Sequence, residues 1–169
     1  MALSKIDAAN LLTGTIPSGN IATSSLSAAV TGDVLQVVST KKSSAYTTSA
    51  NSWTGVTGFN VDITPSATSS KIYVLVTCGS FQNDNGNARA QMKLIRDSTD
   101  IALGDAATGA EVSSVVCGRS NDGAHHQFPT VISVLDSPSS TSQLTYSIQV
   151  QRGADEAGVI CLNRSGSQD

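Results

Sequence analysis

Aromatic and charged residues are scarce in this chain. Aromatic side chains make up 4% of its 169 residues and charged side chains 14%, whereas hydrophobic residues reach 39%. Strong helix formers are either few or not grouped at helical spacing, while Thr and Val favour strands and Ser, Gly and Asn favour turns. The composition therefore predicts an all-β protein whose surface is kept wet by hydroxyl groups more than by charges.

Basic clusters and long apolar stretches are also lacking. The net charge is −3 with a pI near 5.2, and no group of Lys and Arg offers a footprint for a phosphate backbone. No apolar run approaches the length of a membrane span, and no apolar core follows residues 1–5 as it would in a signal peptide. We therefore expect no nucleic-acid partner, no membrane insertion and no secretion by an ordinary signal route.

Cysteines are few, odd in number and widely spaced. Cys78, Cys117 and Cys161 each lie in or beside an apolar run. They are interpreted as buried free thiols of a protein made in a reducing cytoplasm. The chain is long enough to bury a core without disulfides or metals.

The first thirty residues carry a five-residue repeat. Large aliphatic side chains recur at Ile6, Leu11, Ile16, Ile21 and Leu26, with a small residue two positions before each. A step of about 500° cannot form a helical stripe, and an odd step alternates the faces of a strand. The segment must therefore bend at every repeat.

Two structures satisfy this period. One is a narrow single-chain coil, and the other is an extended stalk in which three chains direct the aliphatic residues at a shared axis. One chain with so few steps and no cap buries too little to be stable, so we predict that residues 1–32 form a trimeric stalk. A disordered leader rich in Ser, Thr and Gly is the alternative.

Residues 33–169 are predicted to form a β-sandwich or jelly-roll-like head. Short strand-like runs are separated by clusters of Gly, Pro, Asn, Asp and Ser, at the spacing typical of such folds. Residues 144–150 alternate cleanly, and residues 72–78 are apolar on both faces, which indicates a central strand. The expected strands are 34–40, 53–64, 72–78, 90–95, 112–117, 128–135, 144–150 and 159–163, with the first three in one sheet.

Residues 65–73 and 138–146 are similar to each other in sequence. In each, a proline opens a loop rich in hydroxyl groups, and a tyrosine follows at the same offset in the next strand. Pro65 and Pro138 end the preceding strands because proline cannot pair in a ladder. We expect two equivalent crossovers of a Greek-key body.

Two polar loops are the candidate binding sites, and both are expected to be exposed. Residues 82–87 lack the distal glutamate of a calcium loop and are interpreted as a hairpin turn. The histidine pair has no acidic or thiol partner at ligand spacing, which favours a surface loop, although six imidazoles on a trimer axis could take a metal. The residues in question are Asn83, Asp84, Asn85 and Asn87 in the first loop, and Arg119, Asn121, Asp122, His125 and His126 in the second.

Catalytic motifs are not found. Ser39 and Lys42 match the Ser-x-x-Lys of serine acylases, but they lie at an expected strand end without the accompanying motifs. There is no phosphate loop, zinc-finger spacing, nucleophile elbow or pair of catalytic carboxylates, and Asp155-Glu156 is typical of a solvated turn. The sequence predicts a protein that is not an enzyme and uses no cofactor or metal.

Several phrases together resemble a family of phage tail-fibre and virion-fibre proteins, over almost the whole chain. The phrases are Leu12-Thr-Gly-Thr-Ile-Pro-Ser-Gly, Val34-Leu-Gln-Val-Val, Val61-Asp-Ile-Thr-Pro-Ser-Ala-Thr-Ser-Ser-Lys-Ile, Leu94-Ile-Arg-Asp-Ser-Thr, Leu103-Gly-Asp-Ala-Ala, Val134-Leu-Asp-Ser-Pro and Leu162-Asn-Arg-Ser. The resemblance implies a homotrimeric virion appendage, made in the bacterial host cytoplasm. Its stalk would face the particle and its β head would point outward, often toward a host receptor.

Two departures from the family shorten this chain. Similar heads continue past the Asn-Arg-Ser phrase into one more strand, and similar fibres carry a longer particle-binding region before the stalk. A short head fibre or capsid decoration protein is therefore expected, held by its stalk to a phage capsid or tail protein. The alternative is a tail-fibre tip that adheres to the host surface, although sparse aromatics argue against a sugar site. A depolymerase would need an acid pair that the sequence does not show.

Overall fold

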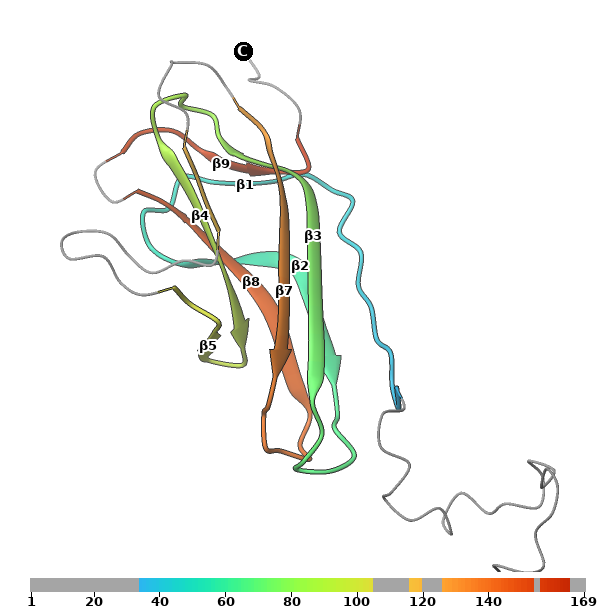
Figure 1. Cartoon of the computed structure of the whole chain (residues 1–169). Coiled ribbons are helices and arrows are strands. Elements are labelled where there is room, and N and C mark those ends of the chain that lie inside the picture. The colour runs from blue at the N-terminus through green and yellow to red at the C-terminus, as the bar shows by residue number, and fades with distance from the viewer. Residues whose placement is uncertain (1–33, 105–115, 120–125, 154–155, 165–169) are drawn as a thin grey trace, which may run out of the picture. The chain divides into compact units, whose positions relative to one another are not determined.

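A computed structural model describes residues 34–104, 116–119, 126–153 and 156–164 of the chain (Figure 1). The chain divides into two units, residues 1–37 and 38–169, which are taken separately. The predicted stalk residues Ile6, Leu11, Ile16, Ile21 and Leu26 lie outside the described residues, as does most of the expected strand 112–117.

The first unit is described only over residues 34–37. Val34, Leu35 and Val37 are 79%, 76% and 81% exposed, and these residues form no strand. The expected strand over residues 34–40 is therefore wrong. Its apolar pattern is present, but no described strand pairs with it, and an unpaired segment gains no ladder hydrogen bonds.

The second unit is all-β over its described residues, with two antiparallel sheets and no helix. One sheet has the strand order β1-β9-β3-β7, and the other has the order β2-β8-β4-β5 with β6 also paired to β4. The strands are Tyr46–Thr48 (β1), Thr54–Ile63 (β2), Ile72–Asn83 (β3), Arg89–Arg96 (β4), Thr99–Ile101 (β5), Val116–Arg119 (β6), Phe128–Asp136 (β7), Leu144–Arg152 (β8) and Ile160–Leu162 (β9).

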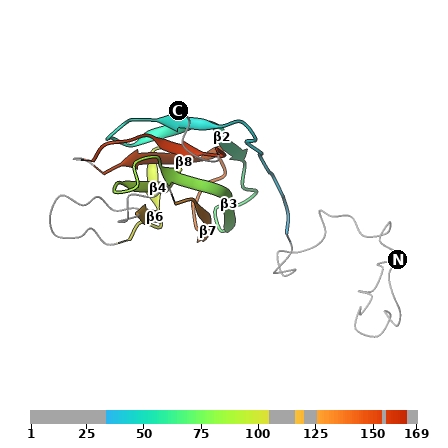
Figure 2. The same cartoon turned by 90° about the horizontal axis from the view of Figure 1, so that it is seen from above.

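Seen from above, the strands lie in two layers, with β2 and β8 in one and β3 and β7 in the other (Figure 2). The inward side chains of both layers form one apolar core, which agrees with the predicted sandwich. The first sheet contributes Ile72, Val74, Cys78, Phe81, Ile132, Ile160 and Leu162, and the second contributes Val56, Ala90, Met92, Leu94, Leu144, Tyr146, Ile148 and Val150.

The two Pro-initiated loops carry the chain between the sheets, as predicted. Residues 64–71 join β2 to β3, and residues 137–143 join β7 to β8. The two tyrosines nevertheless face opposite ways, since Tyr73 is 63% exposed and Tyr146 is 3% exposed. Tyr73 is the second residue of its strand and Tyr146 the third, and a shift of one residue reverses the face of a strand.

Two expectations about sheet membership are wrong. The segment 53–64 was expected in one sheet with 72–78, but β2 and β3 belong to different sheets. Residues 82–87 were expected to form a hairpin turn, but residues 82 and 83 belong to β3, and residues 84–88 join β3 of one sheet to β4 of the other. Hydrophobic alternation tells which face of a strand is inward, and it carries no information on which sheet the strand joins.

Candidate functional site

The first candidate loop is a corner that holds the two sheets together. Asp84 bonds the backbone of Val159 twice: its amide donates to the carbonyl at 2.9 Å, and its Oδ1 accepts from the amide at 2.5 Å. Asn83 donates from Nδ2 to the carbonyl of Arg89 at 3.1 Å and accepts at Oδ1 from the amide of Asn85 at 2.9 Å. These side chains satisfy backbone groups at the corner.

The predicted exposure of this loop does not hold throughout. Asn83 is only 5% exposed, and Asp84 and Asn85 are half-buried, whereas Asn87 is exposed. The buried side chain of Asn83 links β3 to β4 through its bond to the Arg89 carbonyl, and its Oδ1 also accepts from the Asn85 amide within the loop. Whether the loop binds a ligand stays a prediction.

The chain segment before β9 closes over the same corner. Glu156 pairs with Arg89, with Oε1 3.0 Å from Nε, and its other oxygen accepts from the Arg89 amide. The side chain of Glu156 is 14% exposed, so the interpretation of this residue as part of a solvated turn is wrong. Gly158 lies next to Asn83 and Asp84 with φ of +98°, where a Cβ would collide with both side chains.

We expect Gly158→Ala to destabilise the head by at least about 1–3 kcal/mol, because its positive φ strains an L residue and the added methyl also displaces the corner. Gly58→Ala is the matched control, since Gly58 has φ of +74° with open space around it. Urea unfolding midpoints measure both variants. Equal losses would show that the corner yields to the methyl at no cost.

The second candidate loop is described only in part. Arg119 is the last residue of β6 and lies opposite Arg89 in the ladder, and His126 is exposed just before β7. Asn121, Asp122 and His125 lie outside the described residues. The exposure of the whole loop therefore stays a prediction.

The cysteines do not share one environment. Cys78 and Cys161 are buried free thiols, as predicted, and burial raises the pKa of both. Cys117 is exposed, so the prediction of a buried thiol is wrong there. Its apolar neighbours in sequence were misleading because alternate residues of a strand point to opposite faces.

A charged cluster joins the end of β7 to the opposite sheet. Asp136 Oδ2 lies 2.5 Å from Arg96 Nη1 of β4 and accepts a hydrogen bond from the Tyr146 hydroxyl of β8 at 2.5 Å. Its Oδ1 accepts from the amide of Ser137 at 2.8 Å. The Asp136 side chain is 10% exposed and each of its oxygens has a donor, which makes the ion pair a link between the sheets.

The cluster perturbs the titration of its members. Burial alone would raise the pKa of Asp136, but the hydrogen bonds from Tyr146 and Arg96 outweigh it and hold that pKa below its usual value. Burial and the hydrogen bond to Asp136 raise the pKa of Tyr146, and the hydrogen bond from Arg96 to Asp136 raises the pKa of Arg96. Sequence reasoning missed this cluster because its members come from three separate strands.

The lowered pKa of Asp136 predicts acid sensitivity. The carboxylate contributes its full stabilisation above the unfolded pKa near 3.8, and this is lost as the pH falls through the lower folded pKa. Urea unfolding midpoints of the parent protein should therefore fall as the pH is lowered from 7 to below 4. The midpoint of Asp136→Asn should fall less steeply below pH 4, because that variant has no carboxylate at this position. Parallel pH profiles for the two proteins would contradict the prediction.

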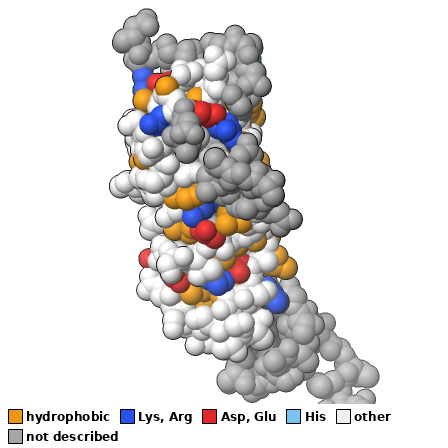
Figure 3. Space-filling model, turned by 90° about the vertical axis from the view of Figure 1, so that its left-hand side faces the viewer, with side chains coloured by type: hydrophobic (Ala, Val, Ile, Leu, Met, Phe, Trp, Pro, Cys, Tyr) orange, Lys and Arg blue, Asp and Glu red, His pale blue; other side chains and the backbone are white. Residues whose placement is uncertain are grey.

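Lys93 of β4 is also held by partners. Its Nζ lies 2.7 Å from Asp100 Oδ1 and 4.8 Å from the centre of the Trp53 ring. Figure 3 shows the general pattern on one face, where basic and acidic side chains lie next to one another rather than in patches of a single sign. Such a face gives no field that would steer a strongly charged ligand.

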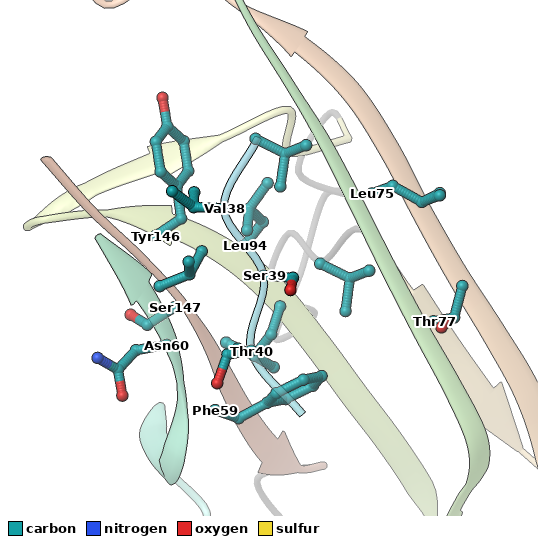
Figure 4. Close-up of a pocket in the computed structure, with 14 residues that line it drawn as sticks. Val38, Ser39, Thr40, Phe59, Asn60, Leu75, Thr77, Leu94, Tyr146 and Ser147 are labelled. Atoms are coloured by element: carbon teal, nitrogen blue, oxygen red, sulfur yellow. The ribbon is translucent and has the colours of Figure 1, made fainter. Parts of the chain in front are cut away.

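A cavity of about 170 Å³ lies between the sheets, bounded by residues 38–40, β2, β3, β4 and β8 (Figure 4). Val38 and Thr40 come from the segment before β1, Phe59 from β2 and Tyr146 from β8, and all four line the cavity. Its lining contains no Asp, Glu, His, Lys, Arg or Cys. Its described walls are mainly apolar and suit a small apolar group.

The outer face of β3 and β7 is the largest feature that sequence reasoning missed. Tyr73 and Leu75 of β3 are 63% and 57% exposed, and Val131 and Leu135 of β7 are 62% and 64% exposed. Residues 72–78 were interpreted as a central strand, which is confirmed because β3 lies between β9 and β7 in its sheet, but residues 73, 75 and 77 leave one face of the strand exposed. The signal was present in the sequence, because a strand that is apolar on both faces needs a cover for each.

Two further findings concern the described part of the chain. No group of three or more His, Cys, Asp and Glu residues there lies close enough together to hold a metal ion. Nor does that part contain a helix with the length and apolarity to cross a membrane. Comparisons of the chain with protein-family models, with curated proteins and with solved structures find no match.

Proposed function

We propose that this chain is a structural component of a bacteriophage virion. It is a short homotrimeric fibre or capsid decoration protein displayed on the particle surface. Residues 1–32 form the trimeric stalk, which binds a capsid or tail protein, and residues 33–169 form the jelly-roll-like head.

The observation that carries this proposal is the exposed apolar segment directly after the five-residue repeat. Val34, Leu35 and Val37 expose most of their side chains, and no described strand pairs with them. Adjacent large apolar residues without cover mark an interaction site in a soluble protein. Together with the aliphatic repeat of residues 6–26, they favour a chain that is completed by association.

The polar groups of the head support a structural role. Asp136 and Glu156 form ion pairs, and Asp62 accepts hydrogen bonds from Thr145 at 2.7 Å and from Gln143 at 2.8 Å. Asp97 accepts from the amide of Thr145 at 2.9 Å. These carboxylates fasten strands and loops to one another, which is the use a rigid head makes of them.

The mass of the purified full-length chain in solution tests the proposal. Light scattering should give three times the 17.3 kDa of one chain. A monomer at micromolar concentration would remove the fibre and leave a lone two-sheet domain. Particle attachment is tested separately, by detecting the chain in purified virions.

A further inference from the structure

The exposed side chains of β3 and β7 form one continuous surface, which we call the β3–β7 face. In the ladder Tyr73 lies opposite Leu135, Leu75 opposite Ser133, and Thr77 opposite Val131. All six point away from the core, since the residues between them on both strands are buried or half-buried. Figure 4 agrees, because Leu75 lies on the side of β3 away from Phe59 and Tyr146.

The β3–β7 face carries no charge. The ionisable groups that flank it are engaged elsewhere, since Asp136 bonds Arg96 and Tyr146, and Lys71 Nζ bonds the Ser137 hydroxyl at 2.7 Å. The outward face of the other sheet differs, because its edge presents polar and acidic groups such as Asn60 and Asp62. The β3–β7 face is therefore chemically unlike the outer side of β2.

The size of the β3–β7 face limits what it can hold. Four large apolar side chains, each more than half exposed, present an area on the order of several hundred Å², the range in which exposed patches mark interaction sites. A stable interface between independent proteins needs about 800 Å² per partner. The β3–β7 face is thus suited to a partner that a second attachment already holds nearby.

A second copy of this chain meets these conditions best. Copies joined through their stalks would meet at a high effective concentration, so a small face suffices to fix the heads. Each copy has a net charge of −3, and a charge-free surface lets like-charged copies approach closely.

We propose that the β3–β7 faces of the copies pack against one another around the three-fold axis of the trimer. This inference rests on the proposed function, because it takes the trimer as given. It assigns β3 and β7 to the inside of the assembled head and leaves the other sheet facing outward.

A cysteine at the centre of the face tests the arrangement in the full-length chain. Ser133→Cys is introduced together with Cys117→Ser, which removes the exposed native thiol. A short bis-maleimide crosslinker should then join two copies of each trimer, giving dimers on a denaturing gel. Thr57→Cys in the same background is the control, because Thr57 is exposed on β2 of the other sheet and should give no dimers.

A charge on the face provides the second arm. Val131→Asp added to the Ser133→Cys chain should lower the crosslinked fraction several-fold, because it buries unpaired carboxylates between the copies. Thr57→Asp should leave that fraction unchanged. Both positions are exposed, and circular dichroism verifies that each variant folds.

The outcomes separate the two proposals. A trimeric mass with crosslinking at residue 133 and not at residue 57 supports the packed β3–β7 faces. A trimeric mass with no crosslinking at residue 133, or with equal crosslinking at both positions, overturns this inference and leaves the proposed fibre intact. A monomeric mass overturns the fibre itself.

Discussion

A full-length chain carrying Ile16→Asp is expected to run as a monomer, with a solution mass three-fold below that of the parent. Ile16 is the central member of the aliphatic repeat. In the proposed stalk its three copies meet at one axis, so the substitution would place three carboxylates together in an apolar setting. Repulsion and loss of hydration there outweigh what the remaining repeats contribute.

Ser18→Asp is the matched control for this variant. It adds the same charge two residues away, at a position that carries neither the aliphatic nor the small residue of the repeat. Light scattering should return a trimer for Ser18→Asp and a monomer for Ile16→Asp. An intact trimer from Ile16→Asp would show that the five-residue period does not mark an assembly axis.

Phe81→Ala is expected to lower the free energy of unfolding of the head by about 3–5 kcal/mol. Phe81 is 0% exposed, and it lies opposite Phe128 of β7 and Leu162 of β9. It is thus the position at which three strands of one sheet meet. Removing the ring leaves a cavity, because packed interiors relax only partly around a deleted side chain.

A loss of this size is a large part of the total stability of a single domain, which is about 5–15 kcal/mol. Urea unfolding at fixed protein concentration measures it, with the fluorescence of Trp53 as the signal. Thr57→Ala, an exposed change in β2, should cost little. A loss below about 1 kcal/mol for Phe81→Ala would contradict the assigned packing.

The strands could be predicted from the sequence where one face meets water and the other meets the core. Residues 144–150 alternate between apolar and polar side chains, and they form most of β8. Its apolar side chains Leu144, Tyr146, Ile148 and Val150 are buried. Residues 34–40 have a similar apolar content but form no strand. The difference is a partner strand, which local sequence does not encode.

The pairing of strands could not be predicted for a related reason. The short loop 84–88 has the length and polarity of a hairpin turn, but it crosses between the sheets. The cluster at Asp136 was equally hidden, because its partners Arg96 and Tyr146 lie 40 and 10 residues away in sequence. The β3–β7 face could be suspected from residues 72–78, which are apolar on both sides. That pattern predicts a partner for each face of the strand but does not identify the partner.

The two-sided apolarity of β3 also bears on how reliably the head folds. Over residues 72–76, hydrophobicity alone would accept this strand turned over, with Tyr73 and Leu75 inside and Ile72 and Val74 outside. The polar contacts at its two ends distinguish the alternatives: Lys71 reaches Ser137 at one end, and Asn83 bonds Arg89 at the other. The facing of this strand is therefore fixed outside residues 72–76, by these end contacts together with Phe81, which is fully buried further along it.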